Sequence, residues 1–334
     1  MLLSETGVDL DDWRGAFNGA EGSGNGNGNG SRVLPADLEQ LGKHLAASYI
    51  PNLAVIDCTA SDAPAAHYLE WMRQGVHVIT PNKKLGSGPL DRYRRVRQLQ
   101  RERMTHFFYE ATVGAGLPVI GTLKHLVETG DRVVRIEGVF SGTLSYIFNT
   151  FGAKDDSGKA SPLTFSQVVA EAKAKGYTEP DPRDDLSGTD VARKVAILAR
   201  EAGLPLELDD IPVESLVPAE LQSVATAEEY LSRLPDFDGD MASRLASAEA
   251  SGEVLRYVGV VDAESGKGSV ELRRYPRDHP FAQLQGSDNI IAFTTARYFK
   301  QPLIVRGPGA GADVTAGGVF SDLLRLAAHL GAPS

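Results

Sequence analysis

Only one cysteine, Cys58, occurs among the 334 residues of the sequence, and no apolar run is long enough to span a bilayer. A single cysteine forms neither an intrachain disulfide nor a zinc cluster of thiolates, and it fits a reducing compartment. A membrane-spanning helix would need about 20 consecutive apolar residues. The N-terminal residues also lack the basic and apolar stretches of a signal peptide. We therefore expect a soluble intracellular protein that does not enter a membrane.

An excess of positive charge is missing as well, because 44 acidic side chains against 34 basic ones give a net charge of −10. A chain of this charge is a poor partner for a phosphate backbone, so we expect no nucleic-acid binding. The hydrophobic content of 42% is typical of a globular protein. The length is enough for about two domains, each with its own core.

The sequence also lacks the Gly-x-Gly-x-x-Gly fingerprint that opens a dinucleotide-binding fold between a strand and a helix. The glycine–asparagine repeat at 24–29 has no strand pattern before it and no helix pattern directly after it, so it is not this fingerprint. The surrounding residues 22–31 are of low complexity and cannot bury apolar surface, which predicts a disordered loop.

An alternation of helix and strand patterns nevertheless runs from residue 35 to residue 109. Short apolar runs typical of buried parallel strands lie at 53–59, 76–80 and 105–109. Helical patterns lie at 35–47, from a cap at Ser61 or Asp62 to Gly75, and at 90–103. This order predicts an incomplete Rossmann-type nucleotide-binding domain over residues 1–117. In such sheets ligands lie beyond the strand C-termini, where Thr59, Lys83 and Glu110 occur.

The remainder of the chain has a different pattern. Strand patterns lie at 133–140, 254–261, 270–274 and 290–295. No segment of helix length joins the later ones, so we expect these strands to pair antiparallel. Helical patterns lie at 142–151, 164–175 and 188–202. We expect a mixed α+β domain over residues 118–306 after the α/β domain that precedes it. Residues 307–334 should form a glycine-rich turn and a helix that returns to the nucleotide-binding domain.

An acid-rich segment at 176–194 runs directly into the predicted helix at 188–202. Asp190 and Lys194 lie one turn apart on that helix and share a face, with Lys194 projecting between Ile197 and Leu198. A lysine on a partly apolar face beside a carboxylate can exchange a proton. An ordinary surface ion pair has the same spacing, and Ser187 with Asp190 also forms a plausible capping box.

Five segments together resemble homoserine dehydrogenase, most closely the dehydrogenase half of the plant-type bifunctional aspartate kinase–homoserine dehydrogenase. They are Pro-Asn-Lys-Lys at 81–84, Glu-Ala-Thr-Val-Gly-Ala-Gly-Leu-Pro at 110–118, Phe-Ser-Gly-Thr-Leu-Ser-Tyr at 140–146, the segment 176–194, and Gly-Pro-Gly-Ala-Gly-Ala at 307–312. The resemblance covers the chain from about residue 50. It implies reversible reduction of L-aspartate 4-semialdehyde to L-homoserine with NADP or NAD as cofactor, on the route to threonine and methionine. It also implies a homodimer, with residues 118–306 as the α+β substrate and dimerisation domain.

The resemblance also implies roles for individual residues. Lys194 and Lys83 match catalytic positions, although Lys84 makes the choice within 81–84 less certain. Three acids match positions that hold the amino-acid substrate, namely Glu179, Asp185 and Asp190. Four residues match positions near the cofactor, namely Thr59, Lys83, Gly176 and Gly311. Each also has a plain structural interpretation: a loop lysine, a capped helix start, or turn chemistry before a helix.

A monovalent cation site, for sodium, is implied by Glu110, Val113, Ala115 and Leu117. The Glu110 carboxylate and the three backbone carbonyls would give the all-oxygen coordination that a hard cation prefers. A glycine-bearing turn between strand and helix needs no ion, so this alternative stays open. We expect the cation to be structural, since hydride transfer requires no Lewis acid.

The missing fingerprint suggests that the first strand and glycine loop of the family lie upstream of Met1. The loop supplies backbone N–H groups to the pyrophosphate, so the chain as given is predicted to bind NADPH poorly. The alternative to an enzyme is an inactive remnant that dimerises or binds amino acid without nucleotide; another semialdehyde dehydrogenase is a more distant alternative. The plant-type resemblance implies a plastid location for the full-length protein.

Overall fold

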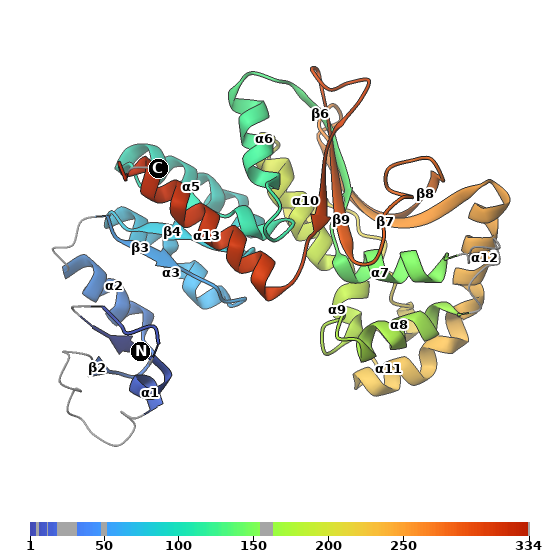
Figure 1. The fold of residues 1–334 in the computed structure, drawn as a ribbon, viewed down its shortest axis with the longest axis horizontal. Coiled ribbons are helices and arrows are strands. Elements are labelled where there is room, and N and C mark those ends of the chain that lie inside the picture. Colours follow the sequence, from blue (N-terminus) through green and yellow to red (C-terminus); the bar gives the residue numbers. More distant parts are fainter. Residues whose placement is uncertain (5–6, 12, 19–31, 48–51, 154–162, 333–334) are drawn as a thin grey trace.

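The structure, a computed structural model, describes residues 1–4, 7–11, 13–18, 32–47, 52–153 and 163–332. The predicted disordered loop at 22–31 lies outside these residues. Two lobes follow one another along the chain, and α13 (Ala312–His329) returns from the second lobe to the first, as Figure 1 shows. Within the described residues, no helix combines the length and the apolarity that crossing a bilayer requires.

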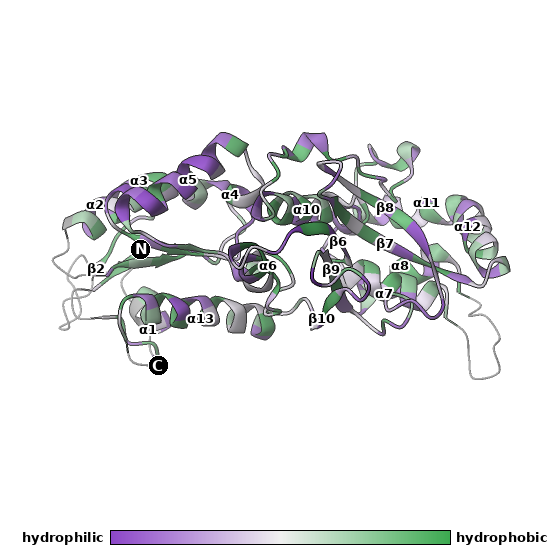
Figure 2. Cartoon of the chain, turned by 90° about the horizontal axis from the view of Figure 1, so that it is seen from above, coloured by the Kyte–Doolittle hydropathy of each residue, from purple (hydrophilic) through white to green (hydrophobic). Residues whose placement is uncertain are grey.

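The first lobe contains a parallel sheet in the order β3 (Ala54–Ile56), β4 (His77–Ile79) and β5 (Phe107–Phe108). Three helices lie on one face of this sheet and α13 lies on the other, as Figure 2 shows. The three are α2 (Leu38–Ala47), α3 (Asp62–Arg73) and α5 (Leu90–Arg103). These layers confirm the predicted parallel sheet of a nucleotide-binding domain. A short antiparallel pair, β1 (Leu2–Leu3) and β2 (Arg32–Val33), and α1 (Trp13–Asn18) precede it.

The prediction that all three strands are buried is wrong for β3. Val78 and Ile79 of the central strand β4 are fully buried, whereas Ile56 of β3 is 43% exposed. Within the described residues β3 forms an edge of the sheet, so its outer side has no neighbouring strand to cover it. The predicted start of α3 is confirmed, because the Ser61 hydroxyl accepts a hydrogen bond from the Ala63 N–H at 3.2 Å.

The second lobe is built on an antiparallel sheet in the order β10-β9-β6-β7-β8. Its strands are β6 (Val133–Val139), β7 (Glu253–Asp262), β8 (Lys267–Pro276), β9 (Asp288–Thr295) and β10 (Leu303–Pro308). The four predicted strands and their antiparallel pairing are confirmed. The strand β10 was not predicted, and its last two residues, Gly307 and Pro308, were expected in a glycine-rich turn. This edge strand alternates between half-buried and exposed residues and ends in Gly307-Pro308, which gives it little apolar signal.

Helices cover this sheet and connect the lobes. Predicted helices appear as α7 (Gly142–Phe151), α8 (Phe165–Ala174) and α10 (Thr189–Glu201). Helices that the sequence analysis did not name are α4 (Lys84–Ser87), α6 (Val119–Glu128), α9 (Pro182–Leu186), α11 (Ala227–Arg233) and α12 (Asp238–Ala250). Short 3₁₀ turns occur at Glu110–Thr112, Leu208–Asp210, Ala219–Leu221 and Leu234–Phe237.

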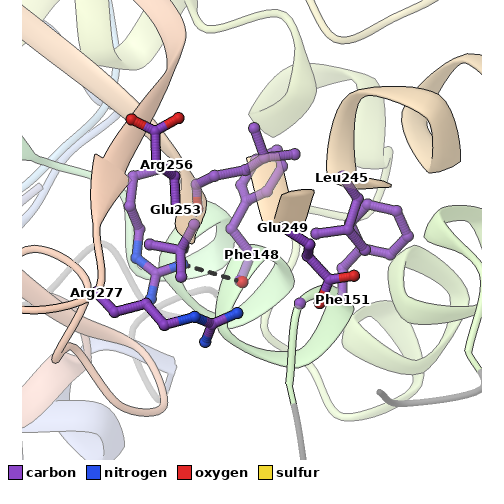
Figure 3. A pocket seen from close by; sticks show the side chains of 10 residues that line it. Phe148, Phe151, Leu245, Glu249, Glu253, Arg256 and Arg277 are labelled. Carbon is purple, nitrogen blue, oxygen red and sulfur yellow. Dashed lines mark hydrogen bonds between the residues drawn. The ribbon is translucent and has the colours of Figure 1, made fainter. Parts of the chain in front are cut away.

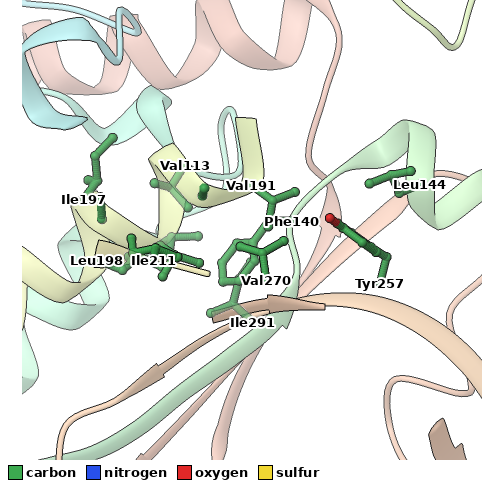
Figure 4. Packing of buried hydrophobic residues seen from close by; sticks show 14 of the residues in the cluster. Val113, Phe140, Leu144, Val191, Ile197, Leu198, Ile211, Tyr257, Val270 and Ile291 are labelled. Atoms are coloured by element: carbon green, nitrogen blue, oxygen red, sulfur yellow. The ribbon is translucent and has the colours of Figure 1, made fainter. Parts of the chain in front are cut away.

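Two glycines allow α10 to approach the antiparallel sheet closely. A Cβ atom added to Gly259 of β7 would lie 2.6 Å from Val195 Cγ2, and one on Gly268 of β8 would lie 2.9 Å from Val195 Cγ1. Figure 4 shows the packing of α10 near this sheet, with Val191 of α10 near Val270 of β8 and Leu198 of α10 beside Ile211. The close approach fixes the distance between α10 and the sheet. It thereby fixes the position of Lys194, which α10 carries.

Gly259→Ala should therefore lower the free energy of unfolding by about 1–3 kcal/mol, because the new methyl group forces Val195 and α10 away from the sheet. Gly239→Ala in α12 is the matched control, since a Cβ there meets no atom within 4 Å. Urea denaturation measures both. A Gly259→Ala midpoint equal to that of the control would contradict this account of the interface.

Candidate active site

A carboxylate shared by two lysines lies where the two lobes meet. Asp190 Oδ2 lies 2.8 Å from Lys194 Nζ, and Asp190 Oδ1 lies 3.1 Å from Lys83 Nζ. Lys194 comes from α10 of the second lobe, and Lys83 follows β4 of the first. Residues more than 100 positions apart in sequence thus form one ionic cluster. The spacing of 190 and 194 on one helix face was predictable, and the approach of Lys83 to the same carboxylate depends on the fold.

Lys194 is buried to 8% exposure, and its ammonium has a second partner. It donates a hydrogen bond of 2.7 Å to the backbone carbonyl of Phe140, which ends β6 and precedes α7. The neighbours of Lys194 on α10, Val191, Val195 and Leu198, are fully or almost fully buried. The lysine side chain is therefore almost fully buried, and two oxygens bind its ammonium. It is not a solvated surface pair.

The predicted capping box at the start of this helix is wrong. The N-cap is Gly188 at φ +75°, and a Cβ on it would collide with the Tyr257 hydroxyl. The Ser187 hydroxyl donates to the Asp184 carbonyl at 3.0 Å, and it caps no N3 amide. The Asp190 carboxylate turns to the two lysines. Gly188 thus allows the chain to turn into α10 close to Tyr257, and the Asp190 carboxylate remains available to Lys83 and Lys194.

Burial shifts the ionisation of both groups in the cluster. Burial lowers the pKa of the Lys194 ammonium, and the Asp190 carboxylate opposes this shift without overcoming it. Burial alone would raise the pKa of Asp190, but the Lys194 and Lys83 ammoniums outweigh it and hold that pKa below its usual range. Asp190 therefore stays ionised, while Lys194 loses a proton more readily than an exposed lysine.

The loop after β4 decides between Lys83 and Lys84. Lys84 Nζ pairs with Asp62 at 2.9 Å on the surface of the first lobe, while Lys83 Nζ faces the second lobe. The Asn82 side chain fixes this loop: its Oδ1 accepts from the Lys84 N–H at 2.9 Å and its Nδ2 donates to Asp57 Oδ2 at 3.0 Å. Of the two adjacent lysines, Lys83 is the one placed beside Asp190.

The acids of the segment 176–194 take different positions. Asp185 Oδ1 accepts from the Thr143 hydroxyl at 2.9 Å, and its Oδ2 accepts from the Glu179 N–H at 2.8 Å. Burial raises the pKa of Asp185, and these hydrogen bonds oppose the shift. The Glu179 side chain is exposed. Asp185 therefore fixes the backbone of the 176–179 loop and leaves the Glu179 carboxylate free to meet a ligand.

The other residues proposed near a cofactor lie at turns. Thr59 is exposed after β3, and its N–H donates to Asp57 Oδ1 at 2.8 Å. Gly311 begins α13 at φ +111°, and Gly176 follows α8 at φ +74°. A Cβ added to either glycine would meet no atom within 4 Å, so the space beside both glycines is open.

The segment proposed for a monovalent cation is already bound by protein groups. Glu110 Oε1 accepts from the Ile120 N–H at 2.7 Å, and Oε2 accepts from the Gly121 N–H at 2.8 Å and from Arg325 at 3.2 Å. The Leu117 carbonyl accepts from the Val119 N–H at 2.8 Å. The Glu110 carboxylate thus binds the N-terminus of α6. Ala115, another residue of the implied cation site, adopts a left-handed φ of +52°.

A pocket shown in Figure 3 lies elsewhere, between α7, α12 and the start of β7. Phe148, Phe151, Leu245 and Arg256 contribute to its wall, and none of the residues predicted for the site does. The Arg256 guanidinium is buried and donates to the Phe281 and Phe148 carbonyls at 2.8 and 3.2 Å. This arginine therefore links α7 to the loop that contains Phe281, and it takes no part in the Lys83–Asp190–Lys194 cluster.

Known proteins match both lobes of the chain. The homoserine dehydrogenase model matches residues 118–324, and the model of the homoserine dehydrogenase NAD binding domain matches residues 18–110. The homoserine dehydrogenase of Schizosaccharomyces pombe is 45% identical over 320 residues, which cover 96% of this chain and 81% of the yeast protein. The chain belongs to the homoserine dehydrogenase family. A nucleotide-binding lobe followed by an antiparallel-sheet lobe is the architecture expected of this family.

A longer relative also matches, and a solved structure has the same fold. The chloroplastic bifunctional aspartokinase/homoserine dehydrogenase 1 of Zea mays is 62% identical over all of this chain. The chain spans about a third (34%) of the length of that maize protein. A hyperthermophilic archaeal homoserine dehydrogenase in complex with NADPH has the same fold, with a TM-score of 0.65 and 24% identity, over 91% of this chain and 78% of that one.

The cluster makes a prediction about Lys194 that needs no turnover. Asp190→Asn removes the carboxylate that opposes the effect of burial, so the pKa of Lys194 should fall further. NMR of protein labelled with [ε-13C]lysine follows this titration directly. Asp62→Asn, which removes the partner of Lys84, is the control and should leave Lys194 unchanged. An identical Lys194 titration in the wild type and in Asp190→Asn would mean that the ion pair is absent in solution.

Proposed function

We propose that this chain catalyses the reversible reduction of L-aspartate 4-semialdehyde to L-homoserine, using NADPH or NADH. The observation that carries this proposal is the buried Lys194 beside Asp190 and Lys83 at the junction of the two lobes. Family membership supports the reaction class. The intact ionic cluster gives no reason to favour an inactive remnant.

The chemistry of the reaction assigns a role to each lysine. Reduction of the aldehyde places negative charge on its oxygen as hydride arrives at carbon, and a bound nicotinamide supplies that hydride. Lys194 would donate a proton to this oxygen, and in the oxidation of homoserine it would remove the hydroxyl proton. The lowered pKa of Lys194 suits both directions, since the proton is held less firmly than in an exposed lysine. Lys83 would keep a second positive charge beside the same oxygen.

Substrate and cofactor would be held by different parts of the chain. The substrate carries an α-ammonium, and the exposed Glu179 with Asp185 and Asp190 would provide the carboxylates that bind it. Four residues would contact the cofactor: Thr59 and Lys83, which follow β3 and β4, and Gly176 and Gly311, at open turns after α8 and before α13. The Gly-x-Gly-x-x-Gly loop that supplies N–H donors to pyrophosphate is not part of these 334 residues. We therefore assign to this chain the contacts at the nicotinamide end.

We further propose a homodimer that forms through the antiparallel sheet. On the face of the sheet turned away from α10, Glu137 of β6 accepts from Arg273 at 2.9 Å and from the Tyr275 hydroxyl at 2.6 Å, both of β8. The Arg273 and Glu137 side chains are 31% and 17% exposed, and their charges are matched within the protein. A half-buried and internally paired face suits an interface between copies. The chloroplastic relatives support a plastid location for the full-length protein.

Lys194→Ala should lower kcat for homoserine oxidation by at least about 10²-fold, because the group that takes the proton is gone. Binding of NADPH, measured by fluorescence titration, should change little. Lys84→Ala removes a neighbouring lysine that pairs with Asp62 and is the matched control. Wild-type turnover in Lys194→Ala would refute the assignment.

A further inference from the structure

We propose that Asn289 is a positioning residue for Lys194 and that it acts through the backbone carbonyl of Phe140. This inference rests on the proposed function of Lys194 as the proton-transfer group. No segment resembling the family pointed to Asn289 in the sequence. Its link to Lys194 comes from the contacts at the junction of β6, β9 and the turn after β10.

One carbonyl oxygen connects the two side chains. Phe140 O accepts a hydrogen bond of 2.7 Å from Lys194 Nζ and one of 3.0 Å from Asn289 Nδ2. Phe140 lies between the end of β6 and Ser141, whose hydroxyl caps α7 by accepting from the Leu144 N–H. At such a junction the direction of a peptide carbonyl is not set by a sheet or helix ladder. The Asn289 amide fixes this direction, and with it the position of the acceptor that Lys194 uses.

Asn289 is itself held rigidly. It has no exposed surface, and a Cβ on Gly309 would collide with its amide group, so Gly309 lies flat against it. Its backbone lies opposite Gly307 in the β9–β10 pairing. The amide therefore has little room to rotate away from Phe140, and a rigid donor is what a positioning role requires.

The second polar atom of the Asn289 side chain has no hydrogen-bond donor in the described part of the chain. No described residue donates a hydrogen bond to the buried Asn289 Oδ1. A buried acceptor without a partner destabilises a fold, and an apolar residue of similar size would fill the same space without that cost. Among the described residues, the hydrogen bond from Nδ2 to the Phe140 carbonyl is therefore the one polar contact that the Asn289 side chain makes.

Two variants separate positioning from stability. Asn289→Leu keeps the volume and removes the donor, so kcat for homoserine oxidation should fall roughly ten-fold or more, while KM stays within about two-fold. Its urea midpoint should not fall below that of the wild type. Asn289→Asp places a carboxylate near the Lys194 ammonium and should raise the pKa of Lys194. The rising limb of the kcat–pH profile for homoserine oxidation should move to higher pH with it.

Asn149→Leu is the matched control. Asn149 Nδ2 also donates to a backbone carbonyl, that of Gly286 at 2.9 Å, and its buried Oδ1 likewise has no donor among the described residues. It makes no contact with Phe140 O or Lys194 among the hydrogen bonds of the described residues. Asn149→Leu should therefore leave kcat and the Lys194 titration unchanged.

The decisive readout is the Lys194 titration by [ε-13C]lysine NMR, which does not depend on turnover. A Lys194 pKa raised in Asn289→Asp and unchanged in Asn149→Leu supports the proposal. A Lys194 titration and a kcat equal to wild type in both Asn289 variants would overturn it. Loss of activity in Asn289→Leu only in proportion to lost stability would overturn it as well. If the wild-type protein did not oxidise homoserine, the proposed function would fail, and the NMR titration would still decide the link between Asn289 and Lys194.

Discussion

The Asp190 carboxylate, shared between Lys83 and Lys194, is the interaction on which the arrangement of the site depends. Lys83 belongs to the nucleotide-binding lobe and Lys194 to the antiparallel-sheet lobe, so one carboxylate binds a lysine from each lobe. Two ammoniums at this distance would repel each other in a partly buried place. The carboxylate between them makes their proximity stable, and it keeps the ionisation of Lys194 within reach of proton transfer.

The helix that carries Asp190, α10, also fixes the position of one lobe against the other. At the far end of α10, the Arg200 guanidinium donates to the Gly86 carbonyl at 2.8 Å and to Glu207 at 3.0 Å. Gly86 lies in α4, directly after Lys83. The next residue, Glu201, accepts a hydrogen bond from the Tyr109 hydroxyl of the first lobe. Because α10 binds the loop of Lys83 at one end and Lys83 itself at the other, a displacement of the helix would move both lysines together.

Much of this arrangement follows from local sequence signals. Alternating strand and helix patterns gave the parallel sheet, and the i, i+4 spacing placed Asp190 and Lys194 on one face of α10. Failures occurred where tertiary contacts override local preference. Ser187 is a better helix cap than Gly188 by propensity, yet only glycine fits beneath Tyr257. Ile56 has an apolar strand signal, yet it lies at a sheet edge. Phe140 contacts Lys194, 54 positions away, and Asn289, 149 positions away. No local sequence pattern predicts contacts between residues so far apart.

Chemical rescue tests the central claim most directly. If Lys194 is the group that moves the proton, the full-length Lys194→Ala protein should regain homoserine oxidation when methylamine or ethylamine fills the vacated space. The recovered rate should rise with the concentration of the unprotonated amine, and the rate of Lys84→Ala should not respond. Turnover by Lys194→Ala at the wild-type rate, with no amine added, would contradict the account.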